Sequence, residues 1–344
     1  HLWDEELGYY AQAIYGRDHK TTAPQADALG EALAVLYGIA TDDRAMDVLK
    51  NTPVLELGIP CTYPLSSQVG AQTVGVACPY AHVFWTLAGV KLQHSKVVQH
   101  GLASGLRQSA FLLTQSPTDA QTTFTLGNAA GQLALFYHVL FGLEAQTDKL
   151  TFAPVVPRSF RGIYKLTNFK YRNVLLNITV SGYGTNIKSF KVNGEEKTDF
   201  EIAANQSGTF TIEMVLNNHD SRKPINLAEA FAVPTTPSLT LSDTTLTWTS
   251  TSDAVFYEVY RNGMLLQSLN DTVLHVAPDT EPAEYQVMAT NKEKIESFRS
   301  NPIFAAPFTH VFVVEPERFV RKSSKAVSGF SGLGYIELKD GDTT

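Results

Sequence analysis

The sequence predicts a multi-domain α + β protein, in which pairs of helices are followed by antiparallel β-sandwich domains. Three observations lead to this prediction. The chain has 344 residues, which is too long for one ordinary domain and suggests two to four. Apolar residues recur with the helical period before about residue 150 and with the strand period after it. Hydrophobic residues make up 44% of the chain and charged residues 18%, a composition typical of globular proteins.

Residues 1–150 are expected to be helical. The segment from Gln25 to Ala40 has one apolar helical face, formed by Leu29, Leu33, Leu36 and Ile39. Further helical patterns cover Pro79–His94, Ser95–Thr114 and Asn128–Leu143. Gly- and Pro-rich stretches separate these segments, notably Leu57–Gly75. Long helices joined in pairs by long loops suggest stacked helical hairpins.

Strand patterns replace the helical ones near Leu150, and residues 151–220 are predicted to form an antiparallel β-sandwich. The segment Tyr171–Val180 is rich in β-forming residues, and Thr209–Val215 alternates apolar and polar residues. Turns between strands are marked by Ser181-Gly182, Gly184 and Asn193-Gly194.

A polar, proline-bearing segment, Asn217–Pro237, is expected to be a linker. Residues 238–306 are predicted to form a second, smaller β module, because short alternating strands recur there at regular spacing. We expect Trp248 and Tyr257 to lie in its core. Residues 311–344 contain two or three strand-like runs at most, which cannot bury a core of their own.

The charge and hydropathy of the chain exclude two classes of partner. The formal net charge is -7, and no cluster of Lys and Arg is dense enough to follow a phosphate backbone, so nucleic acid is not an expected partner. No apolar run reaches the length of a membrane-spanning helix. The acidic triplet Asp4, Glu5 and Glu6 is expected to be a solvated loop, and carboxyl groups that reach the cleft are the alternative.

The two cysteines, Cys61 and Cys78, have a separation that matches no zinc or CxxC pattern. A disulfide across the intervening loop is one expectation in an oxidising compartment. Two free, buried thiols are the alternative, and the residues alone favour it.

Several stretches, in their order along the chain, carry a resemblance to a known family. They are Ala28–Ala40 with Arg44–Pro53, the loop Gly58–Pro64 (GIPCTYP), the run Tyr80–Trp85 (YAHVFW), Ala129–Leu143 followed by Asp148–Pro154, and Tyr171–Val192. Together they resemble the six-hairpin (α/α)6 glycoside hydrolases, in particular the trehalase-like and mannosylglycerate-hydrolase-like groups. The resemblance covers roughly residues 1–216. It implies a partial (α/α)6 toroid over residues 1–150, followed by a sandwich.

Residues 238–306 resemble a fibronectin type III domain, and residues 311–344 resemble the start of a jelly roll of the carbohydrate-binding-module type. We therefore expect the C-terminal portion of a secreted, periplasmic or cell-surface enzyme. Its expected partners are a carbohydrate and the upstream part of the same polypeptide. No cofactor is expected apart from a structural calcium ion at Glu315 and Glu317. Solvent-facing strand charges are the favoured alternative there, because calcium takes six to eight oxygen ligands.

Most glycosidases use two carboxyl groups, one as acid and one as base or nucleophile. The resemblance implies that the acid lies upstream of His1. It would place the base in the loop that contains Asp119, and Glu56, shortly before Gly58, is a second candidate. A turn aspartate and a surface charge at a helix end are the respective alternatives.

Four further side chains are candidate sugar contacts: Tyr63, Tyr80, His82 and Trp85. An aromatic ring can stack on the apolar face of a pyranose, and a histidine can hydrogen-bond to a hydroxyl group. Packing in the core is the alternative for all four, because aromatic side chains are usually buried.

Three functions remain open. The first is hydrolysis of glycosidic bonds in an oligo- or polysaccharide by inverting acid/base chemistry. The second is non-catalytic carbohydrate binding on a degenerate toroid, which is favoured by the short loop Gln115–Phe124 and by Gly127 at a position where relatives carry Trp. The third is an adhesion or interaction protein, which depends on the fibronectin-like domain alone.

Overall fold

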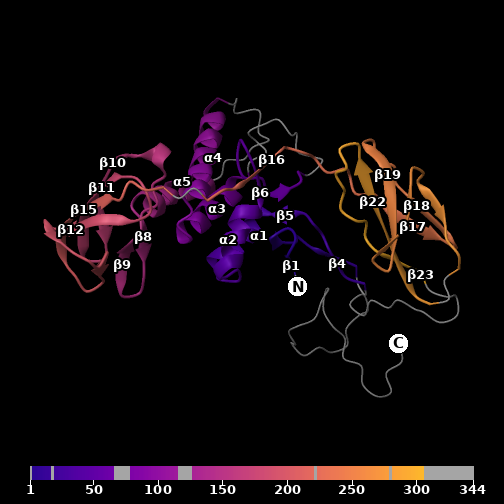
Figure 1. Cartoon of the computed structure of the whole chain (residues 1–344), viewed down its shortest axis with the longest axis horizontal. Helices are drawn as coiled ribbons and strands as arrows, with labels where there is room; N and C mark the ends of the chain where they lie inside the picture. Colours follow the sequence, from indigo (N-terminus) through magenta and orange to yellow (C-terminus); the bar gives the residue numbers. More distant parts are fainter. Residues whose placement is uncertain are drawn as a thin grey trace, which may run out of the picture.

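The computed structural model of the chain describes residues 2–16, 19–65, 78–114, 126–220, 223–278 and 281–305. These residues form an elongated molecule with three parts in a row (Figure 1). A β-sandwich lies at one end, a helical part in the middle and a second β module at the other end. The chain is therefore a multi-domain α + β protein, as the sequence predicts. That the helices are one arc of an (α/α)6 toroid stays a prediction.

Within residues 2–16 and 19–27 the regular elements are short strands, so the expectation of a helical start is wrong. Antiparallel pairs join β1 (Trp3–Asp4) to β2 (Tyr9–Tyr10), β3 (Ile14–Tyr15) to β4 (Thr21–Thr22), and β5 (Ala26–Asp27) to β7 (Thr62–Tyr63). Gly8 and Gly16 have φ values of 69° and 82°, which break a helix and allow tight turns. Tyr, Ile and Thr in the strands are strong β-formers. A further strand, β6 (Pro53–Leu55), also lies inside the region expected to be helical.

The helical part contains α1 (Ala28–Leu36), α2 (Asp42–Asn51), α3 (Pro79–Lys91), α4 (Ser95–Thr114), and α5 (Leu126–Leu135), which continues as a π-helical turn, η2 (Phe136–Leu140). Asp27 is the N-cap of helix α1, and its side chain accepts hydrogen bonds from the backbone N–H groups of Leu29 and Gly30. Helix α3 lies at the centre and packs against α1, α4 and α5. A Cβ on Gly131 of α5 would lie 3.0 Å from Val83 of α3, so a small residue is needed where these helices approach.

The buried face of α1 differs from the predicted one. The buried residues of α1 are Ala28, Glu31, Ala32, Ala34 and Val35. Ile39, expected on the apolar face, is 71% exposed because the helix ends at Leu36. The leucines of the predicted face are only half-buried.

The sandwich contains β8 (Leu143–Ala145), β9 (Lys149–Phe152), a 3-10 turn η3 (Arg158–Phe160), β10 (Gly162–Tyr171), β11 (Val174–Gly182), β12 (Ile187–Val192), β13 (Glu195–Glu196), β14 (Glu201–Ala203) and β15 (Gly208–Leu216). One sheet has the order β10-β11-β15-β12-β13, and the other has the order β14-β9-β8. Strands β11 and β15 are parallel, so the prediction of a purely antiparallel sandwich is wrong. Alternation along a strand shows which face is buried, but it carries no information on strand direction.

The sandwich and the helical part share one hydrophobic core. A single cluster of buried side chains includes Val98 and Leu135 from the helices and Leu176 and Ile212 from the large sheet. The first strand, β8, starts at Leu143, before the switch expected near Leu150. The two parts are therefore packed together rather than separated by a linker.

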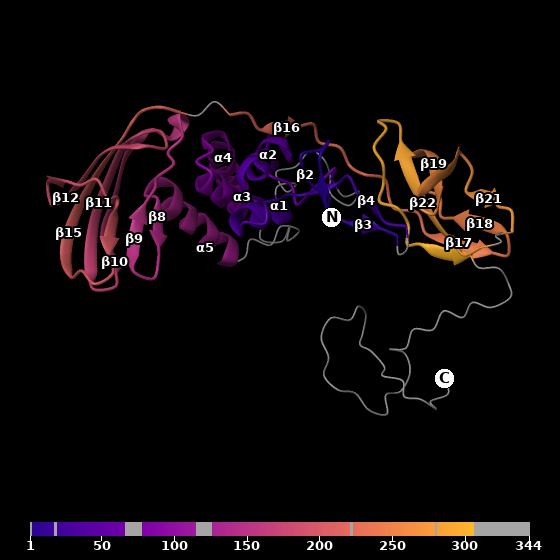
Figure 2. The ribbon, with the colours of Figure 1, turned by 60° about the horizontal axis from the view of Figure 1, so that its bottom comes forward.

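The predicted linker is an ordered segment over most of its length. Residues 223–233, which we call the strap, run from the sandwich across the helical part to the second β module (Figure 2). Its strand β16 (Asn226–Ala228) pairs in parallel with β6, and Leu65 hydrogen-bonds to the backbone of Phe231 and Val233. Ile225 packs against the helical core. The segment connects the sandwich to the second β module, as expected of a linker, but it also pairs with the helical part. Its polar composition does not show where its backbone groups pair.

The second β module, which we call the C-terminal module, contains β17 (Leu239–Ser242), β18 (Thr245–Trp248), β19 (Ala254–Arg261), β20 (Met264–Leu269), β21 (Val273–His275), β22 (Ala283–Asn291) and β23 (Ile303–Ala305). Its two sheets have the orders β17-β18-β21 and β20-β19-β22-β23. Trp248 and Tyr257 are 6% and 4% exposed and their rings meet edge to face. Their predicted place in the core is confirmed.

Two predictions fall on residues that the structure does not describe. The predicted jelly-roll start at 311–344, with Glu315 and Glu317, lies outside the described residues, as does Asp119.

Within the described ranges, no helix combines the length and the apolar character needed to cross a membrane.

Candidate functional site

The loop from Gly58 to Leu65, which the family resemblance singles out, is fastened at three points. Its strand β7 pairs with β5 directly before α1. A disulfide joins Cys61 to Cys78, the residue that precedes α3. Leu65 pairs with the strap. The structure therefore has the disulfide, and the favoured alternative of two free thiols is wrong. The spacing of two cysteines cannot show that the fold brings their Cα atoms to 4.9 Å.

Tyr63 lies in this loop with its side chain half-buried. Its ring packs against Leu55 and Leu65, and its hydroxyl donates a hydrogen bond to the carbonyl oxygen of Glu229 in the strap at 3.1 Å. Partial burial, and then the charge of Glu229, raise the pKa of Tyr63. The side chain is thus held in one orientation and still reaches the surface, as a stacking platform must.

Tyr80 is the second candidate contact that reaches the surface. It is 47% exposed and lies in the first turn of α3. Cys78 precedes this turn, so the disulfide ties the start of α3 to the loop that carries Tyr63.

His82 and Trp85 are both 0% exposed, which corresponds to the core alternative. His82 Nδ1 contacts the carbonyl oxygen of Cys78, and its Nε2 contacts the side-chain amide of Gln132. A carbonyl only accepts, so Nδ1 carries the proton and Nε2 accepts from the amide. Burial lowers the pKa of His82, which favours this neutral form. The side chain joins α3 to α5 and leaves no nitrogen for a sugar.

Glu56 occupies an exposed turn after β6, where Leu55 and Gly58 exchange both backbone hydrogen bonds. It is therefore a turn residue and not the helix-end charge considered from the sequence. The turn packs on α4, where Arg107 donates to the carbonyl oxygen of Leu57 at 3.4 Å. Asp119, the other proposed carboxyl group, lies outside the described residues.

Sequence reasoning missed one carboxyl group close to this loop. Glu31 of α1 is 2% exposed. Its Oε1 accepts a hydrogen bond from the backbone N–H of Tyr10 at 2.8 Å, and its Oε2 is buried without a partner among the described groups. Burial, and to a smaller extent the charge of Asp27, raise the pKa of Glu31 to about 8. The signal in the sequence was a glutamate within the small-residue run of α1.

Tyr9 lies close enough to Glu31 and to Tyr63 for their charges to affect it. Burial raises the pKa of Tyr9 to about 12, with smaller contributions from Glu31, Asp4 and Tyr63. The hydroxyl of Tyr9 donates to the carbonyl oxygen of Pro24 at 3.1 Å. Tyr9 of β2 is thus electrostatically linked to Glu31 of α1 and to Tyr63 of β7. A protonated carboxyl group can donate a hydrogen bond or a proton, and strongly perturbed carboxyl groups are frequent at functional sites.

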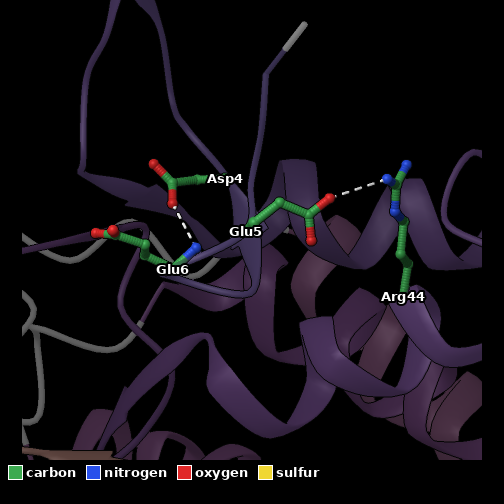
Figure 3. A network of polar contacts seen from close by, with 4 residues as sticks. All are labelled: Asp4, Glu5, Glu6 and Arg44. Carbon is green, nitrogen blue, oxygen red and sulfur yellow. Dashed lines mark hydrogen bonds and ion pairs between the residues drawn. The ribbon is translucent and has the colours of Figure 1, made fainter.

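The acidic triplet at the N-terminus forms a turn and not a site (Figure 3). Asp4 Oδ1 accepts hydrogen bonds from the backbone N–H groups of Glu6 and Leu7, both at 3.0 Å. Glu5 pairs with Arg44 at 3.2 Å on the surface, and Arg44 also lies over the ring of Trp3 at 5.0 Å. In the part of the chain that the structure describes, no three His, Cys, Asp or Glu residues are grouped so as to hold a metal ion.

Comparison with known proteins places this chain in no family. No family model matches it, and no curated protein does. Solved structures with partial likeness include the family 28 exopolygalacturonase of Yersinia enterocolitica, with 15% identity over 22% of this chain and 20% of that chain and a TM-score of 0.17. This chain thus spans a fifth of the length of that enzyme.

Two other solved structures are similar over short stretches. The fibronectin(III)-like modules of CbhA from Clostridium thermocellum have 13% identity over 40% of this chain and 72% of theirs, with a TM-score of 0.21. The spore cortex lytic enzyme SleM of Clostridium perfringens has 12% identity over 33% of this chain and 44% of that chain, with a TM-score of 0.18. At these TM-scores the likenesses carry no argument about activity. The structure itself shows a multi-domain α + β chain, in which a disulfide holds the loop Gly58–Leu65 and α1 carries the buried carboxyl group of Glu31.

Proposed function

We propose that this chain is the C-terminal portion of a secreted, periplasmic or cell-surface glycoside hydrolase that cleaves an oligo- or polysaccharide by inverting acid/base chemistry. The observation that carries the proposal is the loop Gly58–Leu65. Three attachments hold it in place, and it presents Tyr63 at the surface beside the start of α3 with Tyr80. Ordered, half-exposed tyrosines suit the apolar face of a sugar ring, because little conformational entropy is lost on binding.

The proposal includes an (α/α)6 toroid to which upstream helices of the same polypeptide contribute. Exposed apolar side chains on two helices support it. Leu133 on α5 and Phe136 at the start of η2 are 56% and 40% exposed, and Leu106 on α4 is 49% exposed. Apolar side chains that follow one another at helical spacing are normally covered by a neighbouring helix. In the proposed enzyme, the upstream helices would cover them.

We assign the base to Asp119 or Glu56, and the sugar contacts to Tyr63 and Tyr80. In an inverting enzyme the base activates a water molecule, which attacks the anomeric carbon while a general acid protonates the departing oxygen. Loss of such a base lowers kcat by roughly 10²–10⁴-fold. His82 and Trp85 would support the site from the core.

The test is a screen of glycan hydrolysis by the full-length protein with Asp119→Asn, Glu56→Gln and Tyr63→Ala variants. Glu213→Gln, which changes an exposed carboxyl group on β15, is the matched control. We expect one of the two carboxyl variants to lose about 100-fold or more in kcat, the Tyr63→Ala variant to weaken binding, and the control to keep full activity. Full activity of both carboxyl variants would contradict the assigned base.

Non-catalytic carbohydrate binding is the second candidate. The exposed turn position of Glu56 and the burial of His82 and Trp85 favour it, because they leave fewer side chains to act on a substrate. It predicts glycan binding that depends on Tyr63 without any hydrolysis. Absence of both binding and hydrolysis would exclude both candidates.

A further inference from the structure

The C-terminal module contacts the N-terminal hairpin β3–β4 of the helical part, although the two are far apart in the sequence. In Figure 2, the hairpin extends from the helical part towards the C-terminal module. The residue at the centre of the contact is Arg299, which lies between β22 and β23.

Arg299 contacts both sides of this interface. Its guanidinium carbon lies 3.6 Å from the ring centroid of Tyr260 in the module and 5.4 Å from that of Tyr15 in the hairpin. Its Nη1 donates a hydrogen bond to Thr21 Oγ1 in the hairpin at 3.0 Å. The planar guanidinium group can stack on aromatic rings while its edge donates hydrogen bonds. Arg299 therefore links the two parts through three side chains.

The surfaces around Arg299 fit closely. A Cβ on Gly16 of the hairpin turn would lie 2.9 Å from Oε1 of Glu284 in the module, and a Cβ on Gly263 would lie 3.2 Å from the Thr21 side chain. Tyr15 is half-buried at this contact, and burial raises its pKa to about 12. Glu284 and Gln286, polar residues of β22, are each 3% exposed. Gln286 is covered by the module's own segment before β23, because its side-chain amide donates to the carbonyl oxygen of Ser300 at 3.0 Å. Glu284 instead lies at the contact with Gly16 of the hairpin.

The hairpin is in turn connected to the tyrosine loop. The hydroxyl of Tyr15 donates to Oε1 of Gln25 at 3.3 Å, and the carbonyl oxygen of Gln25 accepts from the backbone N–H of Gln12 at 2.9 Å. Gln25 is 2% exposed and directly precedes β5. Strand β5 pairs with β7, placing Ala26 opposite Tyr63.

We propose that docking of the C-terminal module through Arg299 keeps the hairpin β3–β4 and the β5–β7 pair ordered. The module thereby acts as a positioning element for the loop that carries Tyr63, and not as a free tether. Arg299 is a positioning residue in this scheme, acting through Tyr15 and Gln25. The relevance of the docking to glycan binding rests on the proposed function, whereas the docking itself does not.

Amide hydrogen exchange of the full chain without any glycan tests the proposal. We compare the parent with Arg299→Ala, Arg299→Lys and the control Arg158→Ala. Arg158 lies over the Tyr183 ring at 5.9 Å within the sandwich, so its loss removes a similar contact elsewhere. In Arg299→Ala we expect exchange in residues 12–27 and 58–65 to rise about tenfold, with the sandwich unchanged. Arg299→Lys should lie in between, because lysine keeps the charge but lacks the planar group.

A second variant covers the case in which Arg299→Ala unfolds the module itself. Tyr15→Ala removes the contact from the hairpin side and leaves the module sequence intact. We expect it to raise exchange in peptides around Tyr260 and β22. Parent-like exchange of residues 12–27 and 58–65 in Arg299→Ala, or of β22 in Tyr15→Ala, would overturn the proposal. Because no glycan is present, failure of the proposed function leaves this result unchanged.

Discussion

At the residue scale, Glu31 is the side chain whose surroundings differ most from what its type suggests. It lies on the buried face of α1 with one oxygen bonded to the Tyr10 backbone and the other without a described partner. Removing a carboxyl group from water disfavours its charged form, so the protonated form is retained near neutral pH. The hydrogen bond to Tyr10 fastens the β1–β2 hairpin to α1 at this point.

Glu31 should make the stability of the chain depend on pH. Its pKa in the folded chain, about 8, lies above the ordinary value of 4.5. The stabilisation is therefore fully present below about pH 4.5 and is lost as pH rises through 8. The shift corresponds to at most about 5 kcal/mol. Urea unfolding of the parent at pH 5 and at pH 8.5 should show the loss.

Glu31→Gln should remove most of this pH dependence, because a glutamine side chain stays neutral throughout. The exposed carboxyl variant Glu213→Gln is the control and should behave like the parent. If Glu31→Gln and the parent lose stability equally between the two pH values, the carboxyl group is ionised in the folded chain and our assignment fails.

The burial of single side chains was predicted correctly in some cases and not in others. Trp248 and Tyr257 were correctly placed in a core, because the β pattern of their own module points them inwards. Trp85, for which sugar contact and core packing were both open, is in the core, and Ile39 is exposed. Spacing on a helix shows which residues share a face, but the neighbours in the tertiary structure decide which face is covered.

At the element scale, the Cys61–Cys78 disulfide links the loop Gly58–Leu65 to the residue before α3. The cysteines are 17 residues apart, so the cross-link restricts the unfolded chain. In the chain-entropy description, a loop of this length contributes about 3 kcal/mol to stability. The disulfide also ties Tyr63 to the start of α3.

We expect the double variant Cys61→Ser/Cys78→Ser to lose about 3 kcal/mol in urea unfolding. The parent in the presence of dithiothreitol should lose a similar amount, and the double variant should not respond to the reductant. Equal stability of the oxidised parent and the double variant would show that the cross-link does not constrain this loop.

The longer helices were predictable from the sequence, whereas the short strands before α1 were not. Helix α4 spans Ser95–Thr114, the same bounds that the sequence suggested, because a long amphipathic period is a strong local signal. The parallel pairing of β11 with β15 was not predictable. Both strands bury alternate residues, and this pattern is identical for parallel and antiparallel neighbours.

At the scale of the whole molecule, the strap connects all three parts. It starts at the sandwich, pairs with β6 and Leu65 in the helical part, and continues into the C-terminal module. Its backbone hydrogen bonds include one from the N–H of Val233 to the carbonyl oxygen of Leu65 at 2.7 Å. Together with Arg299, the strap gives the module two separate attachments to the helical part.

Val233→Pro should loosen the strap, because proline has no backbone N–H to donate. Val233→Ala is the matched control, since it also loses the buried side chain but keeps the hydrogen bond. We expect limited proteolysis within residues 217–237 to be about five to ten times faster in the proline variant than in the alanine variant, as loss of roughly 1 kcal/mol implies. Equal cleavage rates would show that this bond does not hold the strap.

The sequence by itself determined the succession from the main helices to the β modules, both ends of α4, the start of α3 and the strand pattern of the C-terminal module, because these follow from spacing between near neighbours. Only the tertiary structure decided the burial of Glu31, the disulfide, the direction of β15 and the contacts of the strap. Arg299 and Thr21 are 278 positions apart. Contacts at such separations form between faces that several segments build together, and no local period along the chain encodes them.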